Sequence, residues 1–353
     1  MGLTSTSFLA SLAVVTGLAV LATLLLWGRV PGPGWLRWCA RVLMIGVCQL
    51  TAVCVVGAWV NNSYGLYASW DDLLGRTGAE TADAAMPGPP VGRARFTPSA
   101  GGTRTTYFRG IHSRLSGEVL VSTPAGYDDP ANRTRRYPVV MLLHGVPGGP
   151  ESWLEHGDMP DAWRQSTEQG TTEPAILVMP AIAPGGFDTD CTDTPQRKNA
   201  TWLAADVPEL VAHHFRTLPH PRGWGLLGIS TGAYCAAHLP LQYPKVFAAG
   251  AALDPDPLTG DPDVIADPVL RERTSPMALV RGSTADVALL LATSRQDRDS
   301  PPRYIEEFEN AAAGTPVRVT TRIVPSGGHN FQTWTAMYPF ALPWLSEQLT
   351  AGS

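Results

Sequence analysis

Trp224-Gly-Leu-Leu-Gly228-Ile-Ser230-Thr-Gly232-Ala-Tyr234 is the stretch that decides the fold of this chain. An apolar run precedes Gly228-x-Ser230-x-Gly232, and a helix-forming run follows it. The order of strand, glycine-flanked serine and helix predicts a nucleophile elbow, in which a sharp turn lifts the serine hydroxyl above a sheet. The pattern alone is common in glycine-rich chains, so its meaning depends on the rest of the sequence.

The bulk composition narrows the class of protein. The chain has 353 residues, of which 44% are hydrophobic and only 16% charged, and its net charge is −5. Some of the many hydrophobic residues are expected to lie in a membrane. The sequence has no run of lysines and arginines, which excludes a nucleic-acid partner. No cysteine or histidine spacing is typical of a metal site, so we expect neither metal nor cofactor. Whether Cys191 and Cys235 form a disulfide is left open.

Two apolar segments near the N-terminus, residues 3–27 and 42–60, each have about the length of a membrane-spanning helix. A cleaved signal peptide is the alternative for the first, but a basic start and a clear cleavage site are missing. The connector between them carries Arg29 and Arg37, with Arg41 just beyond. Arginines in a short loop favour the cytoplasmic side, so a hairpin over residues 1–60 predicts that everything after it faces outward.

The remainder divides into a connector and a globular domain. Residues 61–102 are rich in Ala, Gly and Pro and predict a flexible connector, with a short helix over 69–74. From residue 103 to 353, strand patterns alternate with helical ones. Strands are expected at 118–123, 137–145, 174–180, 225–229, 246–253, 287–293 and 317–324, and helices at 201–216, 231–243, 301–313 and 334–349. This alternation predicts an α/β fold with a mostly parallel, doubly wound sheet.

Acyl transfer through a serine requires a base and a carboxylate that orients the base. For an elbow of this type the chain order is Ser, acid, His, which points to Ser230 and His329, the latter on a Gly-Gly loop after the last predicted strand. His238 fits better as a packed helix residue. For the acid we favour Asp297, just past a strand, and then Glu306. The other choices are Asp299, Asp254 and Asp256.

The oxyanion of such a reaction needs two N–H donors. One is expected from Thr231, directly after the nucleophile. The other is expected from the loop His144-Gly-Val146-Pro147-Gly-Gly after a buried strand. Proline has no N–H, so Val146 is the predicted donor.

These motifs together resemble the esterase D type of α/β-hydrolase, which includes feruloyl esterases, S-formylglutathione hydrolases and mycobacterial mycolyltransferases. The resemblance rests on Leu142-Leu-His-Gly-Val146, Gly228-Ile-Ser-Thr-Gly232, Tyr243-Pro-Lys-Val-Phe-Ala248 and Gly327-Gly-His329-Asn, with Trp334 soon after. It implies the α/β-hydrolase fold and the roles given above to Ser230, His329, Val146 and Thr231. Most members place the acid where Asp297 stands, whereas the mycolyltransferases use a position like that of Glu306, so the acid stays open.

The expected function is a membrane-tethered, extracytoplasmic serine esterase or acyltransferase. Its substrates would be acyl esters, with envelope lipids or glycolipids as an expectation by analogy. The main alternative is a catalytically inactive envelope scaffold of the same fold, and a serine peptidase is a third. The acidic loop Asp188-Thr-Asp190-Cys-Thr-Asp193 could help to bind substrate, or it could be an ordinary solvated loop.

Overall fold

The computed structural model of the chain describes residues 6–64 and 88–349. The chain divides into two compact units, Met1–Thr77 and Gly78–Ser353, and each is described by itself. The short helix that we expected over residues 69–74 lies outside the described residues.

The first unit contains two helices, α1 (Thr6–Leu26) and α2 (Gly34–Tyr64). They pack on each other, and the Thr23 hydroxyl lies 3.3 Å from the Cys48 Sγ. Both helices are long and apolar enough to cross a membrane, by length and composition only. The described side chains of this pair include many exposed apolar ones, such as Leu24 and Leu43.

The predicted start of the second apolar segment, at residue 42, was wrong. The helix α2 begins at Gly34, so Arg37 and Arg41 lie on its first turns rather than in or beside a loop. Arginine is a good helix former, and the N–H of Arg37 already donates to the Pro33 carbonyl, so polarity alone does not stop the helix. Arg29 remains in the short turn between the two helices.

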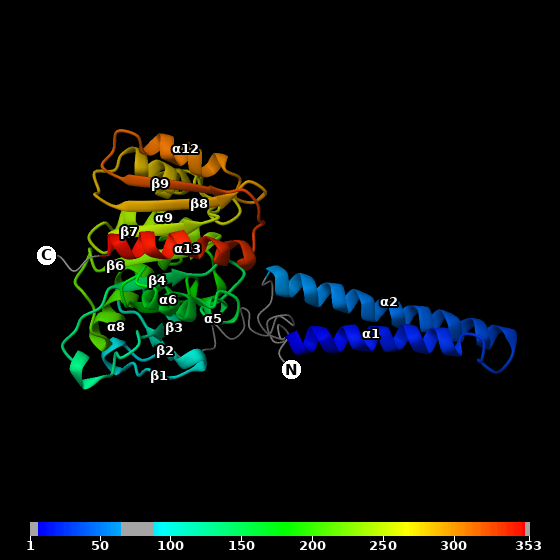
Figure 1. The fold of residues 1–353 in the computed structure, drawn as a ribbon. Helices are drawn as coiled ribbons and strands as arrows, with labels where there is room; N and C mark the ends of the chain where they lie inside the picture. Colours follow the sequence, from blue (N-terminus) through cyan, green and yellow to red (C-terminus); the bar gives the residue numbers. More distant parts are fainter. Residues whose placement is uncertain (1–5, 65–87, 350–353) are drawn as a thin grey trace. The chain divides into compact units, whose positions relative to one another are not determined.

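The second unit is built on one nine-stranded sheet, ordered β1-β2-β3-β5-β4-β6-β7-β8-β9 (Figure 1). The strands are β1 (Thr97–Pro98), β2 (Arg104–Arg109), β3 (Ser116–Ser122), β4 (Val139–Leu143), β5 (Ile176–Pro180), β6 (Trp224–Ile229), β7 (Ala249–Leu253), β8 (Ala288–Ser294) and β9 (Arg318–Val324).

The sheet is mostly parallel, as the alternation of strands and helices predicted. The strands from β5 to β9 in this order pair in parallel, whereas β1, β2 and β3 form an antiparallel edge. Residues 88–102, which the sequence assigned to the connector, lie in this second unit. Val91 and Ala94 are buried there in the core beside the helix Val207–His214. A segment this short and proline-rich has no hydrophobic periodicity from which its packing on the hydrolase domain could be predicted.

Helices cover both faces of the parallel strands. Their bounds are α5 (Ser152–Glu155), α6 (Met159–Glu168), α7 (Asn199–Thr201), α8 (Val207–His214), α9 (Thr231–Gln242), α10 (Pro268–Thr274), α11 (Pro276–Arg281), α12 (Arg303–Ala312) and α13 (Phe331–Gln348). The helix expected over 201–216 contains a π-helical turn at Trp202–Asp206.

Successive side chains of each central strand point to opposite faces of the sheet. In β4, Met141 packs in the core that includes α8 and α9, whereas Leu142 packs in the core that includes α6 and α13. Figure 1 shows α13 lying across the near face of the sheet. Burial on both faces explains why these strands are continuous apolar runs. The carboxyl ends of β6, β7, β8 and β9 then meet at one edge of the sheet, where Ser230, Asp254, Asp297 and His329 follow them.

Candidate active site

Ser230 stands in the sharp turn between β6 and α9. Its φ of 54° and ψ of −125° lie in a region that side chains rarely adopt. The neighbouring backbone tolerates only glycine on either side. A Cβ on Gly228 would lie 1.9 Å from the Gly232 carbonyl oxygen, and one on Gly232 would lie 2.0 Å from the Leu143 carbonyl oxygen. The spacing of the two glycines therefore follows from close backbone packing around the turn.

The structure brings Ser230, His329 and Asp297 together. The His329 Nε2 lies 2.8 Å from the Ser230 Oγ, and the Nδ1 lies 2.8 Å from the Asp297 Oδ2. An ionised carboxylate only accepts hydrogen bonds, so the Nδ1 carries a proton and its N–H donates a hydrogen bond to Asp297. The Nε2 of the neutral imidazole is then free to accept from the serine hydroxyl.

Electrostatics favour a charged Asp297 beside a basic His329. Burial raises the pKa of Asp297, but the hydrogen bond from His329 and those from the Ser300 and Asp299 N–H groups outweigh it, so the pKa is lowered. Burial likewise lowers the pKa of His329, but its hydrogen bond to Asp297, the Asp297 charge and the charges of Asp254 and Asp256 outweigh this and raise it. The imidazole is thus a stronger base than an ordinary histidine.

The loops that carry the base and the acid are tied to each other. The Ser294 hydroxyl at the end of β8 donates to the Gly327 carbonyl over 2.6 Å and accepts the Asp297 N–H over 3.1 Å. The Ser300 hydroxyl donates to the Pro255 carbonyl over 2.7 Å, which joins the loop after β8 to the loop after β7. These bonds hold both side chains in place before any substrate binds.

The other carboxylates named from the sequence have different hydrogen-bond partners, although Asp254 and Asp256 lie near the three residues. Glu306 is exposed in the first turn of α12, and the exposed Asp299 approaches Asp297 through its N–H alone. Asp254 accepts the Trp334 indole N–H over 2.7 Å, and Asp256 accepts the Thr231 hydroxyl over 2.7 Å. Neither of these two carboxylates binds the His329 ring.

The two N–H groups expected to hold an oxyanion lie beside Ser230. Thr231 begins α9, and the loop of Val146 passes close by, since a Cβ on Gly145 would lie 3.1 Å from the Ser230 Cβ. Among residues 6–64 and 88–349, neither the Val146 nor the Thr231 N–H donates to another protein group. A helix N-terminus with free N–H groups is a favourable place for an anion.

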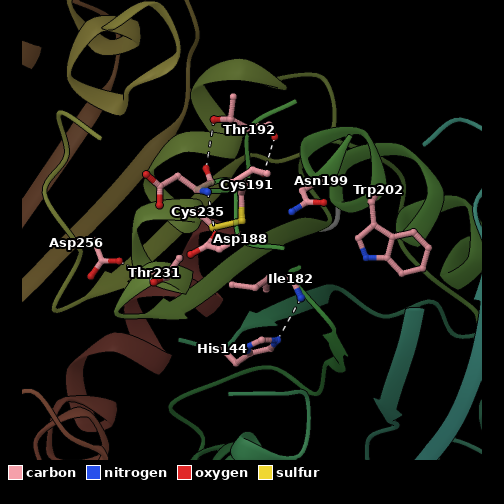
Figure 2. Close-up of a disulfide and its surroundings, with 12 residues drawn as sticks. His144, Ile182, Asp188, Cys191, Thr192, Asn199, Trp202, Thr231, Cys235 and Asp256 are labelled. Atoms are coloured by element: carbon pink, nitrogen blue, oxygen red, sulfur yellow. Dashed lines mark hydrogen bonds between the residues drawn. A yellow bond between two sulfur atoms is a disulfide. The ribbon is translucent and has the colours of Figure 1, made fainter. Parts of the chain in front are cut away.

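His144 holds the loop of Val146 in place, a role that its position in the sequence motif did not predict. Its Nδ1 lies 2.8 Å from the Gly145 carbonyl oxygen, and its Nε2 accepts the Ile182 N–H over 3.2 Å, as Figure 2 shows. Burial lowers the pKa of His144 to about 4, so the ring is neutral and carries its proton on Nδ1. This bridge fixes the Gly145–Val146 backbone. A histidine that ends a buried strand directly before glycine was the available signal.

A disulfide joins Cys191 to Cys235, which answers the question that the sequence left open. Cys235 lies on α9, and Cys191 lies on the loop that carries Asp188 and Asp190 (Figure 2). The acidic loop is therefore attached to the helix that begins directly after the nucleophile.

Comparison with known proteins agrees with this geometry. A family model, Esterase, described as "Putative esterase", matches residues 116–345. An uncharacterised protein of Corynebacterium glutamicum is 23% identical over an alignment of 246 positions, and the match covers 64% of this chain and 55% of that protein. The chain thus spans about half the length of this relative.

Solved structures share the fold. An S-formylglutathione hydrolase from Agrobacterium tumefaciens has a TM-score of 0.58 at 21% identity, covering 72% of this chain and 99% of that one. A ferulic acid esterase from the anaerobic fungus Anaeromyces mucronatus has a TM-score of 0.58 at 17% identity, covering 72% and 95%. At these identities the likeness concerns the fold, and it agrees with the expected α/β-hydrolase architecture.

Proposed function

Because the chain belongs to the Esterase family, we propose that it is a serine esterase or acyltransferase, tethered to a membrane, that acts on acyl esters. The observation that carries the proposal is the unbroken relay from Asp297 through His329 to Ser230, with two hydrogen-bond distances of 2.8 Å. The family supports carboxylic-ester hydrolysis, while transfer to an alcohol and a lipid or glycolipid substrate are parts of our proposal.

In the proposed mechanism the Ser230 Oγ attacks the acyl carbonyl while its proton moves to the His329 Nε2. The N–H groups of Val146 and Thr231 stabilise the negative oxygen of the tetrahedral intermediate. The carbon–oxygen bond to the alcohol then breaks, and His329 returns the proton to the departing oxygen. Water or an acceptor alcohol attacks the acyl-enzyme by the same steps in reverse. Hydrolysis and transfer differ only in which hydroxyl reaches this intermediate.

The membrane part of the proposal rests on the first unit. The apolar spans Phe8–Leu26 and Gly34–Val60 have 19 and 27 residues, and Arg29, Arg37 and Arg41 gather near the turn between them. We infer that this turn faces the cytoplasm and that the hydrolase domain lies outside. The disulfide between Cys191 and Cys235 supports a location outside the cytoplasm, because such bonds persist in oxidising compartments.

The membrane attachment and its orientation can be tested in intact cells that express the full chain with a C-terminal tag. We expect the tag in the membrane fraction after alkaline washing, with removal of the catalytic domain by protease added outside. A tag found in the soluble fraction, or protected from the protease in intact cells, would contradict the tether or its orientation.

The catalytic proposal is tested by replacing Ser230 with alanine. We expect Ser230→Ala to lower kcat for p-nitrophenyl butyrate by about 10⁴-fold or more, because the nucleophile is lost while the fold is kept. The thermal midpoint of unfolding controls for folding. Equal turnover by the variant and the wild type would favour the alternative, a non-catalytic scaffold.

A further inference from the structure

Three carboxylates that the proposed mechanism does not use lie near one another, and one of them lies near the nucleophile. Asp256 is the nearest, because its Oδ1 lies 3.5 Å from the Ser230 Oγ while its Oδ2 accepts the Thr231 hydroxyl over 2.7 Å. Asp188 and Asp190 come from the loop that the disulfide joins to α9. Figure 2 shows Asp188, Asp256 and Thr231 in this neighbourhood.

The chain holds these carboxylates in place through its backbone. The Asp190 N–H donates to the Asp188 Oδ1 over 3.0 Å, and the Asp190 Oδ2 accepts the Asp261 N–H over 3.2 Å. The loop after β7, which also carries Asp256, is thereby connected to the acidic loop. The cluster is therefore a built feature of two segments and one disulfide.

The cluster has a negative potential that ion pairs do not offset in the described part of the chain, although the charge of His329 lowers the pKa of Asp256. Among the residues that the structure describes, none of Asp188, Asp190 and Asp256 forms an ion pair with lysine, arginine or histidine. Burial is the main cause that raises the pKa of all three, to about 7 for Asp190, and the negative charges of neighbouring carboxylates raise each further. Buried carboxylates of this kind are stabilised by a cation.

An independent observation comes from Tyr234, whose side chain is 0% exposed. Within the described part of the chain its hydroxyl has no hydrogen-bond partner. The hydroxyl lies beside Gly260, where an added Cβ would be 3.5 Å away, and Gly260 directly precedes Asp261. Because the Asp261 N–H donates to the Asp190 Oδ2, the hydroxyl lies beside the backbone that holds Asp190. Burial, and after it the charges of Asp190, Asp256 and Asp188, raise the pKa of Tyr234. A buried hydroxyl without a partner costs about 1–3 kcal/mol, which a ligand that bonds to it would recover.

We propose that Asp188, Asp190, Asp256 and Tyr234 form an amine subsite, which binds a protonated amine or quaternary ammonium group close to the scissile ester of the substrate. The proposal rests on the function proposed above and names the substrate class for that site. Because Asp256 lies 3.5 Å from the nucleophile, the ammonium group lies only a few bonds from the carbonyl carbon. Amino-acid esters and esters of amino alcohols have this chemistry.

One physical argument favours an organic cation over a metal ion, and a second favours a bound cation in general. The clusters of described residues whose ligand atoms all lie within 4.8 Å of one another are His112, Asp206 and Glu209, and Asp254, Asp297 and His329. Asp188, Asp190 and Asp256 do not form such a group, so their carboxylates are too widely spaced to share one metal ion. A carboxylate that accepts the Thr231 hydroxyl also opposes the negative charge of the tetrahedral intermediate, and a bound ammonium group cancels that repulsion.

The test uses two p-nitrophenyl esters that differ in one group. The alanyl ester carries an ammonium group where the isobutyryl ester carries a methyl group. The ratio of their kcat/KM values is measured for the wild type and for Asp256→Asn, so the intrinsic reactivity of each ester cancels between the two enzymes. We expect the alanyl preference to fall by about tenfold to a hundredfold, since a hydrogen bond to a charged group contributes about 1.5–3 kcal/mol.

Two further variants make the result specific. Tyr234→Phe removes only the hydroxyl, and we expect it to lower the same ratio. The matched control is Asp263→Asn, which removes one charge from an exposed position of the same loop, and we expect it to leave the ratio unchanged.

A second ester pair, butyrylcholine and 3,3-dimethylbutyl butyrate, tells whether the ammonium group belongs to the acyl or the alcohol part. A larger effect of Asp256→Asn on one pair assigns the group to that part.

The outcomes separate this proposal from the one that it rests on. Retained turnover of the isobutyryl ester, with ratios for both ester pairs that Asp256→Asn and Tyr234→Phe leave unchanged, overturns the amine subsite alone. A wild-type protein whose turnover of every ester equals that of Ser230→Ala overturns the proposed function itself.

Discussion

The loops after β7 and β8 end at the same edge of the sheet, yet they hold their carboxylates in opposite ways. Asp297, after β8, accepts the His329 ring and the N–H groups of Asp299 and Ser300, and these donors lower its pKa. Asp254, after β7, accepts the Trp334 indole, and its Oδ1 has no partner among the described residues. Burial, followed by the charge of Asp297, raises the pKa of Asp254 to about 7. Hydrogen-bond donors offset the burial of Asp297, whereas the burial of Asp254 is not offset, so Asp254 carries its charge only at higher pH.

The two loops nevertheless act on one histidine. The ligand atoms of Asp254, Asp297 and His329 all lie within 4.8 Å of one another, and the negative charge of Asp254 adds to that of Asp297 in raising the pKa of His329. We therefore expect Asp297 to orient the base and Asp254 to tune it. Substitutions in each loop separate these effects.

The largest effect is expected at Asp297. Asp297→Asn removes the charge that stabilises the imidazolium and the acceptor that fixes its tautomer, so kcat/KM for p-nitrophenyl butyrate should fall by about 10³- to 10⁴-fold. Glu306→Gln changes an exposed carboxylate in the same way and should leave kcat/KM within about twofold of the wild type. The reverse pattern would make Glu306 the triad acid.

A smaller effect is expected in the pH profile of kcat/KM. The free enzyme needs neutral His329, whose pKa is raised above the ordinary value of 6.5, so kcat/KM should rise with pH through a midpoint above 6.5. Asp254→Asn removes a negative charge near the ring while it keeps an acceptor for Trp334. The pKa of His329 then falls, and the midpoint should move to lower pH. A midpoint that stays in place, or moves upward, would show that Asp254 does not tune the base.

The smallest effect is expected in thermal stability. The pKa of Asp254 is about 7 in the folded protein against an ordinary 3.8, so the folded state binds this proton more tightly than the unfolded state. The wild type therefore loses stability as the pH rises from about 4 to 7, and the loss stays constant above that. The amide introduced by Asp254→Asn is neutral throughout this range. The Tm of this variant relative to the wild type, measured by calorimetry in detergent, should increase over that interval. A difference that shrinks with pH would contradict the raised pKa.

Much of the fold followed from the sequence because buried strands and elbows have local signatures. The central strand Val139–Leu143 is apolar throughout because it is covered on both faces, and Gly228 and Gly232 are demanded by backbone contacts. The antiparallel edge was only partly predicted. Thr97–Pro98 is too short for any periodicity, and Arg104–Arg109 alternates exposed and buried residues while carrying an arginine at each end.

The choice among acids could not be made from spacing. Asp254, Asp297 and Glu306 all follow strands or begin a helix, and only the three-dimensional set of donors distinguishes them. The disulfide could not be predicted from spacing either, because Cys191 and Cys235 are 44 residues apart and meet only through the packing of a loop on α9. The roles that we assign to Ser230 and His329 remain predictions that the geometry supports.

The central claim is that Ser230, activated by His329, forms a covalent acyl-enzyme. The most direct measurement is intact-protein mass spectrometry after treatment with a fluorophosphonate, followed by peptide mapping. We predict one added phosphonyl group on the peptide that contains Ser230, with none on Ser230→Ala and much slower labelling of His329→Ala. Labelling that is absent from the folded wild-type protein, or that persists unchanged in Ser230→Ala, would contradict the account.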